Sequence, residues 1–292
     1  MASSVERIEQ EIATLDKAVE AIAEEFHRAY SDYLKALGQA VHKQFILANY
    51  HVCTQGYPTQ FLNLSFGQRQ DLQQTLRNLM KQAQLNLSAK LQRPGTVKSS
   101  VPDYLFGNES LSDEFAALEL SVEPDDDAIQ AEREAERSLT PDILAHWQEE
   151  LEQEIVKELR MASHCANHQL QQAGILPKKL PESLLQTASK SEMSEMAAHS
   201  PNLLNVLIEA NDGNPLEQDD FEDSKPSVVH IMAIHLRLSE IEFADSTTVA
   251  IRNKIRSLST RLKSLAREYH KKQRERAIAQ AQDAWRASWF EE

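Results

Sequence analysis

The apolar residues near the N-terminus recur at alternating steps of three and four positions. A period of about 3.5 residues is typical of the contact stripe of a coiled coil. The pattern predicts a helix from about residue 3 to about residue 50. The stripe, called here the N-terminal seam, consists of Val5, Ile8, Ile12, Leu15, Val19, Ile22 and Phe26.

The stretch 51–72, HVCTQGYPTQFLNLSFGQRQDL, interrupts this helical pattern. A helix cannot pass through Gly56-Tyr57-Pro58, because proline removes a backbone donor and restricts the residue before it. Ser65 and Gln68 form a capping-box pattern, which predicts that a second helix begins here and runs to about residue 92. We therefore interpret 51–72 as the corner of a helical hairpin rather than as an active-site loop.

The apolar pattern changes character after the hairpin. Residues 93–138 have no periodicity and contain acidic runs, which predicts a linker. Thr140-Pro141 is a typical helix start, and Gly174 is a typical stop for the third helix. Within the linker, YLFGNESLSDEFAALEL could instead be a short binding segment, because acids and apolar residues alternate in it.

The remaining pattern predicts shorter helices near 181–198 and 202–210, and a last helix over about 247–290. The segment 227–243 fits two periods, since its apolar residues alternate as in a strand and also step as in a helix. We expect a helix there, because the pattern offers no second strand to pair with it. The predicted organisation is a coiled-coil hairpin over 1–92, an acidic disordered linker over 93–138, a central helical region over 139–210, an acidic loop over 211–226, and a C-terminal region with a long basic helix over 227–292.

A second seam follows the last helix at similar spacing. Its flanks carry Arg252, Lys254 and Arg261, whereas the flanks of the N-terminal seam carry acids such as Glu11 and Glu25. Pairing either helix with its own copy would place like charges together. We expect the terminal helices to pack on each other, within a chain or across a homodimer; the alternative is that each seam contacts other helices. This C-terminal seam consists of Ile251, Ile255, Leu258, Leu262, Leu265 and Tyr269.

Composition supports an all-α class. The 292 residues include only seven glycines and ten prolines, and aromatic residues make up 6%, which argues against folds that need many tight turns. The net charge of −14 is unevenly distributed, with 0 over residues 1–92, −20 over 93–245 and +6 over 246–292. We predict an elongated helical, coiled-coil protein with flexible acidic linkers.

The sequence also limits where the protein acts. Two cysteines are too few for a disulfide framework, so a reducing compartment is expected. The N-terminus MASSVERIEQEI lacks the apolar core of a signal peptide, and no apolar run is long enough to span a membrane. These features predict a soluble, cytoplasmic protein.

Two regions carry a resemblance to known proteins. The segments CTQGYP…SFGQRQDLQQTLR and LRLSEIEF…AWRASWFEE, within about 51–80 and 234–292, resemble a family of uncharacterised helical proteins found in cyanobacteria. The resemblance covers about a third of the chain. It implies a prokaryotic cytoplasm, and it carries no activity or site residues with it.

Few residues suggest chemistry. His164 and His168 lie four apart on one helical face, the spacing of a zinc-binding pair, but Cys165 occupies the position of the glutamate in the zinc-protease motif. Cys53 and His51 lack an orienting acid nearby. No glycine-rich phosphate loop occurs. We therefore expect no catalytic residue, no metal and no cofactor.

Aromatic residues at the C-terminus suggest binding. Trp285 and Trp289 lie one turn apart with Phe290 beside them, and such a pair can anchor a helix in a partner's groove or cover the protein's own core. We predict a non-enzymatic adaptor or scaffold that binds other proteins. The alternative is a nucleic-acid-associated protein, less favoured because of the acidic pI near 5.2, whose contacts would include Lys271, Lys272, Arg274 and Arg276.

Overall fold

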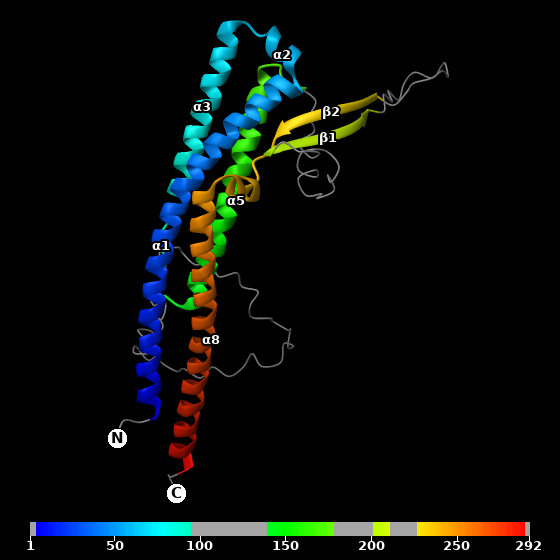
Figure 1. The fold of residues 1–292 in the computed structure, drawn as a ribbon. Coiled ribbons are helices and arrows are strands. Elements are labelled where there is room, and N and C mark those ends of the chain that lie inside the picture. Colours follow the sequence, from blue (N-terminus) through cyan, green and yellow to red (C-terminus); the bar gives the residue numbers. More distant parts are fainter. Residues whose placement is uncertain (1–3, 95–138, 178–200, 211–226, 290–292) are drawn as a thin grey trace, which may run out of the picture. The chain divides into compact units, whose positions relative to one another are not determined.

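The computed structural model describes residues 4–94, 139–177, 201–210 and 227–289 (Figure 1). Nearly all of the linker predicted over 93–138, the helix expected over 181–198, the acidic loop over 211–226 and Phe290 lie outside the described residues. The described part is mainly α-helical, which confirms the predicted all-α class.

Four long helices form most of the described structure. They are α1 (Ser4–His51), α3 (Phe66–Ala89), α5 (Pro141–Gln172) and α8 (Ser246–Trp289). All four were predicted from apolar periodicity, with ends that agree to within about three residues. The periodicity succeeds here because each helix buries one continuous apolar stripe along its length.

The corner between α1 and α3 contains two short helical elements. A π-helical turn, η1 (Val52–Gly56), continues α1, and α2 (Pro58–Asn63) begins at the proline. Ser65 and Gln68 then form the predicted capping box: the Ser65 hydroxyl accepts from the Gln68 amide at 3.3 Å, and the Gln68 side chain accepts from the Ser65 amide at 2.8 Å. The prediction of a corner with a capped restart is confirmed.

The ends of α5 also follow their sequence features. The Thr140 hydroxyl accepts a hydrogen bond from the amide of Ile143 at 3.3 Å, as an N-cap residue does. Gly174 has a φ of +76°, the left-handed conformation that ends many helices. The amide of Ile175 then bonds back to the carbonyl of Leu170 at 2.9 Å.

A two-stranded antiparallel sheet replaces two of the predicted helices. Strand β1 (Leu203–Ala210) pairs with β2 (Ser227–Ile234), with Leu203 opposite Ile234 and Ala210 opposite Ser227. The predictions of a helix over 202–210 and of a helix over 227–243 were therefore wrong, except that α7 (Leu238–Ala244) is helical. The alternating pattern in the second segment does have a strand to pair with, and that strand is the first segment.

Side chains from helical elements bond to the backbone of β2. The carboxamide of Asn167 on α5 bonds to both the amide and the carbonyl of Ile234, each at 2.9 Å. The Ser163 hydroxyl accepts from the amide of Leu236 at 2.9 Å, and the Tyr57 hydroxyl accepts from the amide of Met232 at 3.1 Å. Ser163 and Asn167 are buried polar residues, and these bonds satisfy them.

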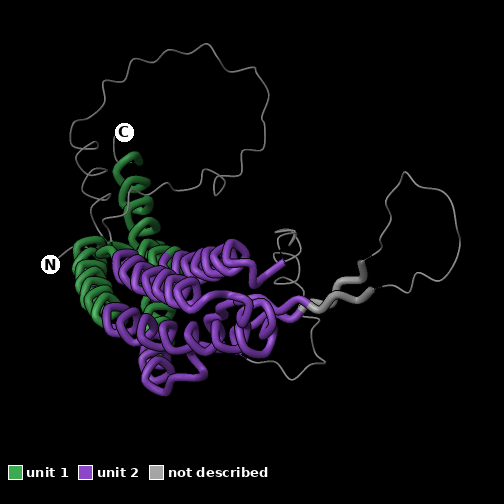
Figure 2. Tube along the Cα trace, turned by 90° about the horizontal axis from the view of Figure 1, so that it is seen from above, with its two compact units in different colours: residues 1–28, 92–150, 256–292 green, residues 29–91, 151–255 purple. Residues whose placement is uncertain are grey.

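The chain forms two compact units, neither of which is continuous in sequence (Figure 2). Unit 1 comprises Met1–Arg28, Gln92–Glu150 and Arg256–Glu292, and unit 2 comprises Ala29–Leu91 and Leu151–Ile255. Each unit therefore contains stretches of α1, α5 and α8, whereas the regions expected from sequence follow one another along the chain.

In unit 1 the first and last helices pack together. Ile8 and Ile12 of α1 form a buried cluster with Tyr269 and Ala279 of α8, and Val5 and Leu15 are partly buried against it. Two ion pairs join the same helices: Glu11 to Lys272 at 2.7 Å and Glu25 to Arg261 at 2.8 Å. The expected contact between the terminal helices thus forms within one chain, between acidic and basic flanks.

The core of unit 2 surrounds the second half of α1. Tyr30, Tyr33, Phe45 and Leu37 are almost completely buried there. All thirteen residues of the two seams, counted over both units, are buried or half-buried. Their apolar side chains therefore stabilise the fold of this chain.

Candidate functional site

The end of α8 presents exposed aromatic side chains. Every residue from 280 to 289 is exposed, so this part of the helix packs against no described element. Trp285 is 65% exposed and Trp289 is 70% exposed, and their ring centroids lie 5.6 Å apart. The chain's third tryptophan, Trp147, is by contrast buried in unit 1, edge-to-face with Phe26 at 6.5 Å. The two terminal tryptophans therefore form an aromatic patch rather than part of a core.

The basic residues preceding that patch are partly occupied by carboxylates of the same chain. Lys272 contacts Glu11 at 2.7 Å and Glu275 at 2.8 Å, and hydrogen bonds to Glu11 and then Glu275 raise its pKa. Lys271 lies 4.0 Å from Glu275. These contacts leave less positive charge for nucleic-acid phosphates than the sequence alone suggests.

Unit 2 contains a charged cluster around Arg252 of α8. Its guanidinium contacts Glu242 of α7 at 2.6 Å, makes two hydrogen bonds to Glu152 of α5, and lies over the ring of Tyr33 of α1 at 4.4 Å. The Tyr33 hydroxyl donates to Glu242, and the Tyr30 hydroxyl donates to Glu152. Each charged group has a partner of opposite charge, as buried ion pairs require.

Burial and charge act on the pKa values of this cluster in opposite ways. Burial raises the pKa of Tyr33 well above its usual value, although Arg252 opposes this. Burial lowers the pKa of Arg252, but the hydrogen bonds and charge of Glu152 and the hydrogen bond to Glu242 more than compensate, so its pKa is raised and it stays protonated. The cluster therefore joins side chains of α1, α5, α7 and α8 through charged hydrogen bonds.

The paired histidines and the cysteines lie apart from these features. His164 and His168 are exposed on α5, as their position opposite the apolar stripe predicted. Among the described residues, no group of three or more His, Cys, Asp or Glu side chains has the arrangement of a metal site. Cys53 is buried, and burial raises the pKa of its thiol to about 11, so the thiolate is scarce at neutral pH.

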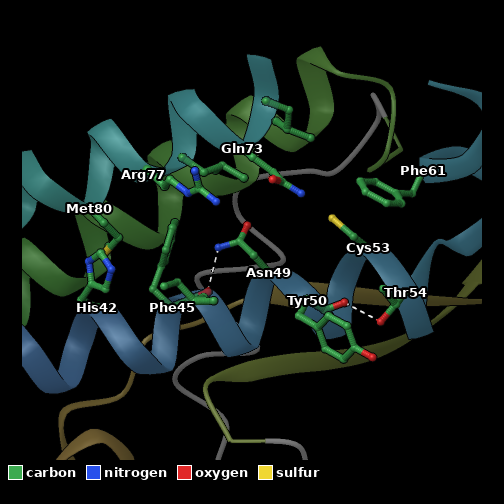
Figure 3. Close-up of a pocket in the computed structure, with 13 residues that line it drawn as sticks. His42, Phe45, Asn49, Tyr50, Cys53, Thr54, Phe61, Gln73, Arg77 and Met80 are labelled. Carbon is green, nitrogen blue, oxygen red and sulfur yellow. Dashed lines mark hydrogen bonds between the residues drawn. The ribbon is translucent and has the colours of Figure 1, made fainter. Parts of the chain in front are cut away.

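A cavity of about 400 Å³ lies beside the corner that the sequence predicted (Figure 3). Its walls come from α1, η1, α2 and α3 of unit 2 and are mainly apolar. They include Phe45, Cys53, Phe61, Leu72, Leu76 and Met80.

Polar side chains of both long helices also line this corner cavity. His42 and Asn49 come from α1, and Gln73 and Arg77 come from α3. Arg77 and Gln73 extend from α3 toward the side of the cavity where Asn49 lies (Figure 3). Asn49 is held by a 2.8 Å hydrogen bond from its Nδ2 to the carbonyl of Phe45, and its Oδ1 is shielded from solvent. Sequence reasoning identified the corner but missed the cavity, because its walls come from residues nearly forty positions apart.

No family model, curated protein or solved structure matches the chain. The resemblance to cyanobacterial helical proteins therefore stays a prediction. Among the described residues, no helix combines the length and the apolar composition needed to cross a bilayer.

Proposed function

We propose that the protein is a non-enzymatic helical adaptor or scaffold that binds another protein through the exposed end of α8. The observation that carries this proposal is the aromatic patch of Trp285 and Trp289, 65% and 70% exposed on a helix end without packing partners in the described chain. Large exposed aromatic side chains are costly in water and are enriched at binding hot spots.

The geometry fits a partner with an apolar groove that accepts one face of a helix. Ile278, Trp285 and Trp289 follow the spacing of anchors in helix-in-groove recognition, and Ile278 is also 49% exposed. Asp283 and Arg286 lie 3.4 Å apart on the same segment and can remain in water at the edge of such a groove. The proposed partner is therefore a folded protein with an apolar groove, and a second copy of this chain is an outcome of the test.

The alternative, a nucleic-acid-associated protein, has weaker support. Lys271 and Lys272 contact glutamates, and Arg252 and Arg261 are also ion-paired within the chain. We also propose that the protein is located in the cytoplasm and that it does not catalyse a reaction. Both proposals rest on the sequence composition and on the absence of a catalytic motif.

The test combines capture with fluorescence. Full-length protein captures partners from native lysate with and without nuclease treatment, and each partner that survives the treatment is purified and titrated against it. Because Trp147 is already buried, binding at the patch should shift tryptophan emission to shorter wavelength mainly through Trp285 and Trp289. The double variant Trp285→Ala/Trp289→Ala should bind at least about tenfold more weakly, as hot-spot truncation does.

A matched control separates this patch from general exposed hydrophobicity. Phe66→Ala removes another aromatic ring, 80% exposed on α3, and should bind the partner as tightly as the unaltered protein. Equal binding by the double variant would exclude the patch. Loss of every captured partner on nuclease treatment would favour the nucleic-acid alternative, and a dimer that requires both tryptophans would identify a second copy as the partner.

A further inference from the structure

The corner cavity in unit 2 has the size and lining of a small-molecule site. Its volume of about 400 Å³ falls within the range of about 300–1,000 Å³ common for ligand cavities. Two lining residues on α1, Ile46 and Tyr50, remain 51% and 58% exposed, so apolar surface continues to the cavity opening. A ligand with an apolar body would bury this surface and fill the space between α1 and α3.

The charge of the lining restricts the ligand further. The thirteen residues around the cavity include Arg77 and His42 but no aspartate or glutamate. No ion pair joins Arg77 to a carboxylate of the described residues, in contrast to Arg252 and Arg261. An exposed guanidinium that has no ion-pair partner among the described residues, at the side of an apolar cavity, favours an anionic group, and its planar fork suits a carboxylate.

The neighbouring polar group points to the same chemistry. Gln73 extends from α3 beside Arg77, so its amide N–H groups can donate to the same oxygen atoms (Figure 3). Both side chains are exposed to solvent, so an anionic ligand would gain a partly solvated ion pair with Arg77, whereas an amine would be repelled by it.

We propose that the corner cavity binds a small amphipathic carboxylate, with its apolar chain between α1 and α3 and its carboxylate at Arg77 and Gln73. This site is separate in sequence from the aromatic patch of α8, and it requires no partner protein. Substitution of Trp285 and Trp289 therefore leaves it intact.

The experiment is isothermal titration calorimetry of the full-length protein with three probes of equal chain length, each below its micellar concentration or its solubility limit: decanoate, decan-1-ol and decylamine. We expect decanoate to bind with one saturable site and decylamine to bind more weakly. Arg77→Gln should weaken decanoate binding about three- to fivefold, the effect of a partly exposed ion pair, while decan-1-ol binding stays the same.

Two further variants locate the site. Lys81→Gln removes an exposed positive charge one turn further along α3, outside the cavity lining, and should leave decanoate binding unchanged. Thr54→Trp places a large side chain at an exposed lining position and should abolish binding of all three probes. Far-ultraviolet circular dichroism of each variant checks that the helices are intact.

Three results would overturn the proposal. The first is the absence of saturable decanoate binding to the unaltered protein. The second is decylamine binding as tightly as decanoate, since that would show that Arg77 does not select the ligand's charge. The third is unchanged decanoate binding by a folded Thr54→Trp variant, which would place the probe elsewhere on the surface.

Discussion

Single side chains in the interior of unit 2 carry charge that the fold must neutralise. Arg252 has a side chain only 11% exposed, and its partners Glu152 and Glu242 are 27% and 14% exposed. Moving such groups out of water costs free energy that their mutual attraction roughly offsets. The pairs therefore add little net stability while they are complete, and their disruption leaves a charge without a counterion.

Replacing Arg252 with alanine should lower the free energy of unfolding by about 3 kcal/mol, because Glu152 and Glu242 would lose their shared cation. Urea unfolding followed by circular dichroism measures this loss. Lys254→Ala provides the control, since Lys254 is exposed two residues further along α8 and should change the value by less than about 0.5 kcal/mol. Similar effects from both substitutions would contradict a structural role for the cluster.

At the scale of elements, hydrogen-bonded caps define where helices begin. Asp245 precedes α8, and its Oδ2 accepts from the amide and the hydroxyl of Thr248 at 3.0 and 2.8 Å. These bonds, the backbone one first, lower the pKa of the Asp245 carboxyl below its usual value. The folded protein therefore holds this carboxyl's proton more weakly than the unfolded chain does, and its contribution to stability is present above pH of about 4.

Asp245→Ala should reduce the free energy of unfolding by about 1 kcal/mol at neutral pH, the usual loss on removing an N-cap. The difference from the unaltered protein should shrink as the pH falls through the folded pKa, below about 4, because protonation removes the same interaction from the native protein. Denaturant titrations at several pH values measure it. Asp245→Asn retains an acceptor and should lose less; an equal loss in both variants would show that the accepted hydrogen bonds are not the source of this stability.

Local sequence features predicted the helices well and the strands poorly. The long helices, the Ser65 capping box and the stop at Gly174 depend on residues within a few positions of one another. The strand over 227–234 depends on pairing with 203–210. The alternating pattern within 227–234 does not indicate which distant residues will pair with it. The sequence offered one indication of the sheet: Ser163 and Asn167 are polar residues on the otherwise apolar face of α5. Buried polar side chains need hydrogen-bond partners, and here the partners are backbone groups of β2 and of Leu236.

The corner cavity could not be predicted for a related reason. Phe45 and Asn49 look like ordinary helix positions on α1, and Leu72 and Leu76 look like an ordinary stripe on α3. Only their arrangement around the corner leaves space between them. The exposure of Trp285 and Trp289 could not be predicted from the sequence either. An apolar stripe predicts that a helix face makes contacts, but it does not show whether the same chain supplies them.

At the scale of the whole molecule, neither unit can be separated by cutting the chain in a linker. Each unit takes a stretch from α1, from α5 and from α8, so the units share three continuous helices. A fragment such as 1–92 would lack the stretches of α5 and α8 that complete the cores of its parts. The apolar seams would then be exposed, which favours aggregation over independent folding.

Shortening the chain from its C-terminus should reveal where unit 1 ends. Removal of 281–292 should shift the melting temperature by less than about 2 °C, because the described residues 281–289 are all exposed and cover no apolar surface of the core. Removal from Tyr269 onward should lower it by more than about 5 °C, since Tyr269, Lys272 and Ala279 contact α1. Thermal melts followed by circular dichroism compare the two, and a large shift from the shorter deletion would contradict the exposed state of the helix end.

The hydrogen bonds that Asn167, Ser163 and Tyr57 make to β2 and to the residues just after it also affect whether another strand can pair with the sheet. A two-stranded sheet has free edges, and an exposed edge can add a strand from another chain. The amides of Met232 and Ile234 on β2, and of Leu236 just beyond the strand, already donate to these three side chains. These bonds leave fewer free peptide groups for an incoming strand at the C-terminal end of this edge of β2.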